Sequence, residues 1–92
     1  MGLAEMERWL ADTKRAVDAA RPYVPDSELT DVDHLIEHGE PLIGLSMLAH
    51  AIVENGLRVP RTVIDHIRES VTGTSEEPFL PDRLEEHVLR DQ

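Results

Sequence analysis

The sequence contains no cysteine, and only three of its 92 residues are aromatic: Trp9, Tyr23 and Phe79. Without thiols, the chain can form no disulfide, no zinc–thiolate site and no catalytic thiolate. With so few rings the core has to be aliphatic, and we do not expect a pocket for a large aromatic cofactor. The composition therefore predicts a protein without a cofactor.

Long apolar runs and an excess of basic residues are also absent. The longest nearly uncharged stretch, 41–53, is too short to span a bilayer and predicts a buried helix. The first residues lack the basic and apolar regions of a signal peptide. Nine Lys and Arg against 19 Asp and Glu give a net charge of −10, which disfavours binding to nucleic acid or anionic membranes. We expect a cytoplasmic protein with neither as a partner.

What the sequence does contain is helical periodicity. Apolar residues make up 40% and charged residues 30%, a globular composition that fits one domain over residues 1–92. Apolar positions three and four apart, with prolines and glycines between the runs, predict helices at about 3–21, 26–38, 41–55, 60–72 and 81–90. The expected fold is all-α: a small antiparallel bundle of four helices plus a short C-terminal helix, without a sheet.

Two of these helices have informative apolar patterns. The first carries a core stripe with spacings of three and four: Leu3, Met6, Leu10, Thr13, Val17 and Ala20. The third, about 42–55, is apolar around most of its circumference, which predicts a place in the middle of the bundle. Phe79 and Leu80 are expected to anchor the C-terminal part of the chain to the core.

Three polar side chains of the second helix could bind a metal ion. His34 and His38 are four residues apart and share a helical face with Asp31, and two imidazoles with a carboxylate can hold Zn²⁺ or Ni²⁺. The order of residues is not that of a metalloprotease motif, and no fourth ligand is evident. A solvated polar face is the favoured interpretation, so we predict no metal site.

A second polar set lies on the third helix, where Ser46, His50 and Glu54 follow one another at intervals of four. Such steps do not by themselves give the geometry of a catalytic triad, and no oxyanion-binding turn is evident. We interpret the set either as a partly exposed strip, flanked by Ile43 and Met47, that faces a partner or a neighbouring helix, or as the surroundings of a buried, hydrogen-bonded histidine. Neither interpretation makes the protein an enzyme.

Residues 48–68 have the outline of a helix-turn-helix unit with three arginines, Arg58, Arg61 and Arg68. Asp65 is spaced to form ion pairs with Arg61 and Arg68 within one helix, which would leave few cations for phosphates. The acidic second helix is a stronger functional candidate. Residues 22–40 hold six acids and no Lys or Arg, a pattern that favours rapid, salt-sensitive encounter with a basic protein.

The stretch 37–60 resembles the MafI-type immunity proteins of bacterial polymorphic toxin systems, which are short, acidic and helical. The resemblance is carried by a Gly-Glu pair, a small residue, a Leu-x-x-Leu run, an acid and a polar turn, here Gly39, Glu40, Gly44, Leu45, Leu48, Glu54, Asn55 and Pro60. It covers about a quarter of the chain. It implies a cytoplasmic protein that binds and neutralises a cognate toxin domain, without naming the toxin's chemistry.

Together these observations predict an immunity-type protein that blocks a toxin, such as a basic nuclease domain, by stoichiometric binding. The residues expected to contact the partner are Asp33, Glu37, Glu40, Ile43, Met47, His50 and Glu54. The alternatives are a structural or regulatory module that forms a homodimer through the apolar third helix, and a DNA-binding regulator that uses residues 48–68.

Overall fold

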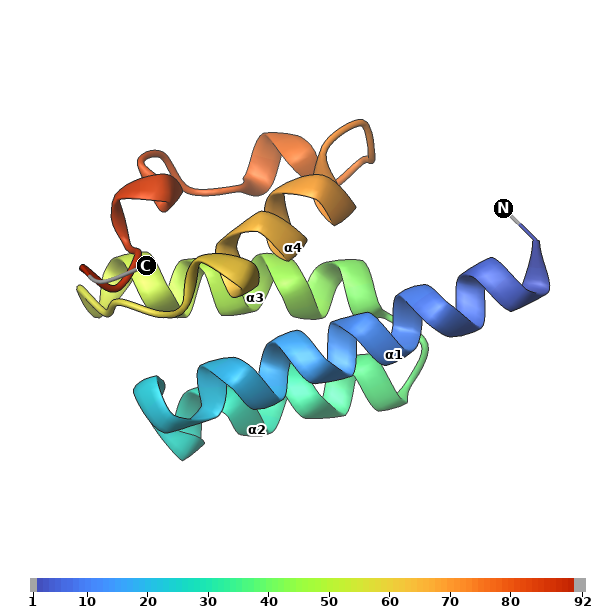
Figure 1. Ribbon diagram of the computed structural model, residues 1–92, viewed down its shortest axis with the longest axis horizontal. Coiled ribbons are helices and arrows are strands. Elements are labelled where there is room, and N and C mark those ends of the chain that lie inside the picture. Colours follow the sequence, from blue (N-terminus) through green and yellow to red (C-terminus); the bar gives the residue numbers. More distant parts are fainter. Residues whose placement is uncertain (1, 91–92) are drawn as a thin grey trace.

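The computed structural model describes residues 2–90, and within them the chain forms four α-helices and three short 3-10 turns. Successive helices run in opposite directions (Figure 1), so the predicted all-α antiparallel arrangement is confirmed. Their bounds agree with the predicted ones to within one residue at each end: α1 Leu3–Ala20, α2 Asp26–Glu37, α3 Pro41–Glu54 and α4 Arg61–Val71. Within residues 2–90, no helix is both long enough and apolar enough to cross a membrane.

Prolines and glycines define where these helices begin and end. Pro25 and Pro60 directly precede α2 and α4, and Pro41 is the first residue of α3, where its missing N–H costs no hydrogen bond. Gly39 and Gly56 follow α2 and α3 with φ angles of 80° and 62°. Side chains disfavour this left-handed conformation, so glycine at these positions stops the helix without strain.

The centre of the bundle is α3, which packs on α2 and on α4, while α4 also contacts α1. As its apolar pattern predicts, α3 is buried over most of its circumference. Gly44 of α3 lies directly against α2. A Cβ atom at this position would lie 3.1 Å from the Ile36 Cγ1 and 3.3 Å from the Val32 carbonyl oxygen, so the crossing requires a very small residue.

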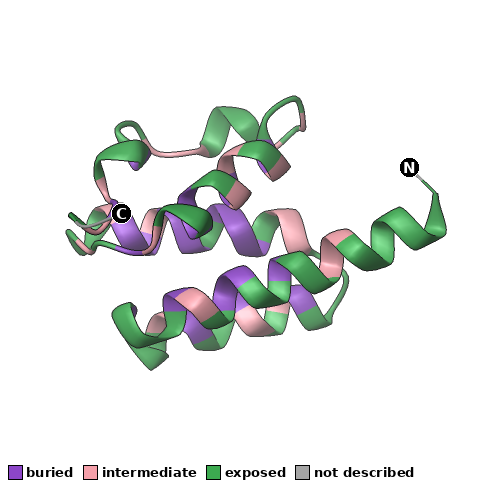
Figure 2. Ribbon diagram, in the orientation of Figure 1, coloured by how far each residue is buried: buried purple, intermediate pink, exposed green. Residues whose placement is uncertain are grey.

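Helix α1 is covered along only part of its length. Thr13, Val17 and Ala20 of the predicted stripe are buried, but Leu3 and Met6 are 77% and 42% exposed. In Figure 2 the N-terminal turns of α1 are exposed, and they extend past the other helices. The prediction of a continuous core stripe is therefore wrong for the first turns, because none of the other elements formed by residues 2–90 covers them.

The predicted C-terminal helix at 81–90 is wrong in its conformation. The segment forms a single 3-10 turn, Leu84–Glu86, preceded by Arg83 with a φ of 65°. Val88 is extended beside Val59, and the Leu89 amide donates to the Val59 carbonyl. This conformation buries Leu84 and Val88 and gains backbone hydrogen bonds to the α3–α4 loop, which an isolated helix of ten residues would not offer.

The anchor of this segment also differs from the expected one. Phe79 ends the 3-10 turn Glu77–Phe79 and is 62% exposed, so it does not anchor the chain, whereas Leu80 packs against the core as expected. The fully buried anchor is Leu84. A third 3-10 turn, Arg21–Tyr23, links α1 to α2.

Candidate functional site

The structure divides the predicted partner-binding residues between two places. Asp33 and Glu37 lie on the side of α2 that faces α1, where they border a shallow cleft of about 300 Å³ together with Lys14 and Arg21. Both guanidinium NH groups of Arg21 donate to the Asp33 carboxylate at 3.1 Å. This hydrogen bonding raises the pKa of Arg21. Asp33 therefore links α2 to the end of α1, whereas the Glu37 carboxylate forms no ion pair with any of residues 2–90.

The other predicted contact residues follow one exposed stripe of α3. Glu40 precedes the helix, and Ile43, Met47 and Glu54 are exposed along it. His50 is partly engaged within the chain: its Nε2 donates to the Phe79 carbonyl at 2.6 Å, and its Nδ1 lies 3.5 Å from the Glu54 carboxylate. His50 thus fastens the C-terminal segment to α3, a role that its sequence position does not indicate.

Ser46 does not belong to this stripe. It is 5% exposed and faces the interior of the bundle, so the expected Ser46–His50–Glu54 strip does not form. The reason is the helical rotation of about 100° per residue: each of the two steps of four residues turns about 40° past a full turn, so Ser46 lies toward the buried side when Glu54 is exposed.

The polar residues of α2 do not assemble into a metal site in the described chain. The rings of His34 and His38 stack with centroids 4.0 Å apart, and the His38 Nδ1 donates to the His34 carbonyl at 2.9 Å. Within residues 2–90, no group of three His, Asp or Glu side chains, Asp31 included, is placed to hold an ion.

Two of the three arginines in the helix-turn-helix outline bind the C-terminal segment. Arg58 donates to the carbonyls of Glu86 and Val88 at 3.4 and 3.3 Å. Arg68 forms a two-pronged pair with Glu85 at 2.6 and 2.8 Å, and this hydrogen bonding lowers the pKa of Glu85. Among residues 2–90, the expected ion pairs of Asp65 with Arg61 and Arg68 are absent, and Arg68 is bound to Glu85 in place of Asp65.

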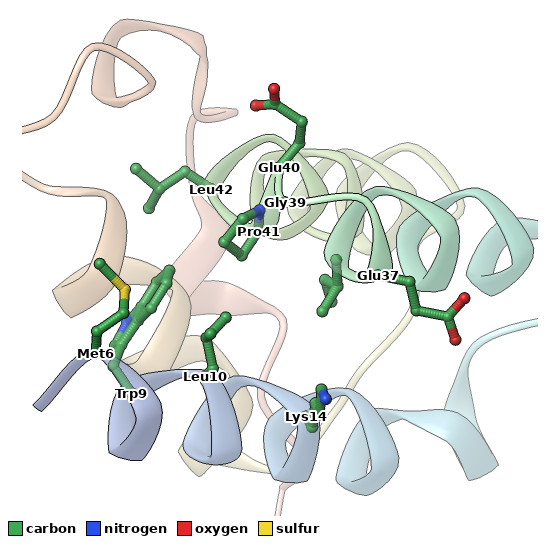
Figure 3. Close-up of a pocket in the computed structure, with 10 residues that line it drawn as sticks. Met6, Trp9, Leu10, Lys14, Glu37, Gly39, Glu40, Pro41 and Leu42 are labelled. Carbon is green, nitrogen blue, oxygen red and sulfur yellow. The ribbon is translucent and has the colours of Figure 1, made fainter. Parts of the chain in front are cut away.

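A large hollow of the surface lies between the first half of α1 and the corner that joins α2 to α3 (Figure 3). It is a cleft of about 620 Å³, which we call the corner cleft. Its lining is mostly apolar, with three charged side chains: Met6, Trp9, Leu10, Ile36, Gly39, Pro41 and Leu42, with Lys14, Glu37 and Glu40. Figure 3 shows the two carboxylates pointing outward from the opening.

Of these residues, sequence reasoning found only Glu37 and Glu40. The available signal was Trp9, which lies three residues after Met6 and is the only tryptophan of the chain. Periodicity placed Met6 and Leu10 on a core stripe, and nothing in it shows that the stripe lacks a cover at this end.

A hydrogen-bonded network joins α1 to α4 on the other side of Trp9. The Thr13 hydroxyl donates to the Trp9 carbonyl at 2.9 Å, so its oxygen accepts from the His66 Nε2 at 2.8 Å. The Trp9 indole donates to the Ser70 hydroxyl at 2.8 Å, and that oxygen lies 3.3 Å from the same Nε2. The Thr13 hydroxyl is therefore closer to Nε2 than the Ser70 hydroxyl is, and it competes with Ser70 for this nitrogen.

Burial in this network lowers the pKa of His66, against the opposing effect of Asp12 and Glu69. The neutral imidazole is therefore the form that the fold favours. Among residues 2–90, every buried side-chain nitrogen and oxygen has a hydrogen-bond partner. The described interior thus holds no unpartnered polar group aimed at a substrate.

Comparisons with protein-family models, curated proteins and solved structures found no match to this chain. The resemblance to the MafI-type immunity proteins stays a prediction from residues 37–60.

Proposed function

We propose that this protein is an immunity-type inhibitor that binds a basic toxin domain in a stoichiometric complex. The observation that carries the proposal is the unpaired negative charge of α2. This helix holds five acids and no Lys or Arg. Within residues 2–90, only Asp33 among the five forms an ion pair. Acids without internal partners repel one another, and that repulsion is relieved when a basic surface binds.

The remainder of the surface supports binding over chemistry. In the best candidate for a nucleophile–base pair, Ser70 with His66, the imidazole Nε2 lies closer to the Thr13 hydroxyl, at 2.8 Å, than to the Ser70 hydroxyl, at 3.3 Å. The acidic helix is continuous at its C-terminal end with an apolar cleft, and protein interfaces combine an apolar centre with a polar rim. An inhibitor of this kind needs no cofactor and acts by covering the toxin's working surface.

The test starts from affinity capture with this protein as bait at low salt, followed by identification of what high salt releases. The captured domain is then expressed alone and together with this protein. We expect a basic domain that is toxic alone and harmless when co-expressed. If co-expression does not relieve toxicity, or only the bait is recovered, the inhibitor proposal is wrong.

Charge reversal then shows whether the acidic residues at the end of α2 are responsible for binding the captured domain. We expect the Glu37→Lys/Glu40→Lys double variant to slow association by about tenfold or more at low salt, with a smaller effect at high salt. The matched control is Asp65→Lys/Asp82→Lys, which changes the net charge equally at exposed positions away from α2. Equal slowing by both variants would mean that only the overall charge matters.

A further inference from the structure

We propose that the corner cleft receives a large apolar side chain of the partner, from a segment that also carries Lys or Arg beside Glu37 and Glu40. This inference rests on the proposed function and adds the place and chemistry of its central contact. Tight protein interfaces concentrate their binding energy in a few anchors that fill desolvated pockets. At the corner cleft this chain presents a hollow, and its exposed aromatic residues, Tyr23 and Phe79, do not line it, so here the chain is suited to supply the pocket and the partner the anchor.

The exposed apolar residues of the molecule favour this cleft over other surfaces. Leu3 and Met6 lie on the turns of α1 beside the cleft, and with Trp9 and Leu10 they form one continuous apolar side of the helix. On the α3 stripe, Ile43 and Met47 are also exposed, but they line neither the corner cleft nor the cleft beside Asp33. Of these two apolar surfaces, the cleft is the one that would desolvate an anchor on several sides, because there α1 faces Pro41 and Leu42 (Figure 3).

Charge complementarity identifies the occupant. The cleft's charged residues are two carboxylates and one ammonium group, and the acidic α2 adjoins it. A second copy of this chain would bring another net charge of −10 against that rim, which opposes self-association through the cleft. A small molecule would need polar groups inside the cleft to orient it, whereas the polar groups here are long charged side chains. A basic protein segment is attracted by the acidic rim, and its own backbone orients the anchor without polar groups inside the cleft.

The probe for this inference is a helical peptide of about four turns, with leucines at spacings of three and four, arginines at the flanking positions and no tryptophan. Its counterpart carries glutamate in place of every arginine. Binding is followed by the fluorescence of Trp9, the only tryptophan of the protein, and is mapped by amide chemical shifts in NMR. We expect the arginine peptide to bind with shifts centred on α1 and the α2–α3 corner, and the glutamate peptide not to bind.

Two methionine variants form a matched pair. Met6 and Met47 both lie on helices and are 42% and 36% exposed, but only Met6 lines the cleft. We expect Met6→Glu to weaken peptide binding by about tenfold or more, and Met47→Glu to change it by less than about twofold. Thermal unfolding of both variants confirms that they fold. Equal weakening by both, no effect of Met6→Glu, or equal binding of the two peptides would overturn the inference.

Sedimentation of the free protein tests the second copy as occupant. A dimer that Met6→Glu dissociates would place another copy of the chain in the cleft and overturn the assignment to a basic partner. The same two variants, tested against a captured toxin domain, separate this inference from the proposed function. If the toxin is neutralised but its binding depends on Met47 and not on Met6, the function stands and the cleft assignment fails.

Discussion

The two halves of α1 carry the same apolar pattern, but one half is buried and the other is exposed. In the C-terminal half, Val17 and Ala20 are buried. In the N-terminal half, Leu3 and Met6 lie at the same helical spacing, but α1 extends past the elements that would cover them (Figure 1). The comparison teaches that an apolar stripe identifies which face of a helix avoids water, and leaves open whether the chain itself or another molecule provides the cover.

The largest expected difference in the free energy of unfolding comes from substituting leucine by alanine at a buried and at an exposed position. Leu48 of α3 is fully buried, and Leu3 of α1 is 77% exposed. We expect Leu48→Ala to lower the free energy of unfolding by about 2–5 kcal/mol, because it removes buried methyl groups and leaves a cavity. Leu3→Ala should change it by less than about 0.5 kcal/mol. Urea denaturation measures both, and a similar loss in the two variants would show that the first turn of α1 is covered.

A smaller loss of stability is expected from a substitution where α3 packs closely on α2. Gly44→Val should lower the free energy of unfolding by about 1–3 kcal/mol, because the added atoms meet Ile36 and the Val32 backbone. The control is Ala11→Val on the exposed face of α1, which changes helix propensity without a close contact and should cost about 0.5 kcal/mol. Unfolding midpoints that fall equally would mean that the crossing can open without strain.

The smallest effect concerns the boundary between the two halves of α1, where Thr13 and Trp9 bind α4 through His66 and Ser70. The pKa of His66 is lower in the folded protein than its ordinary value of 6.5. As the pH falls below 6.5, His66 therefore binds a proton more readily in the unfolded chain than in the folded protein. The neutral His66 contributes fully to the free energy of unfolding above pH 6.5, and this contribution is lost as the pH falls toward the pKa of the folded protein.

We expect the unfolding midpoint of the natural protein to fall further between pH 7 and 5 than that of His66→Gln, whose amide can still donate but does not titrate in this range. Comparing the two removes the effect of the acidic residues, which titrate in both. Trp9 fluorescence should change with pH in the natural protein only, since the two rings are 6.4 Å apart. Identical pH profiles would show that His66 is not shielded from protonation.

Much of the fold could be predicted because its signals are local. Proline and glycine act through the backbone of their own and adjacent residues, so the ends of α1 to α4 follow from sequence to within one residue. The segment after Gly73 could not be predicted in the same way. Leu84 and Val88 have helical spacing, but their conformation depends on hydrogen bonds to Val59, about thirty positions away.

The candidate site also has a part that local sequence patterns predict and a part that they do not. The sequence by itself determined that the acids concentrate on α2 and that α3 is apolar enough to form the centre, because charge and periodicity are properties of the chain. Only the tertiary structure decided that Asp33 is bound by Arg21 while Glu37 and Glu40 border a cleft. It also decided that Met6 and Trp9 face that cleft across from Pro41 and Leu42. The relative position of two helices depends on contacts between residues far apart in sequence, which local patterns do not reveal.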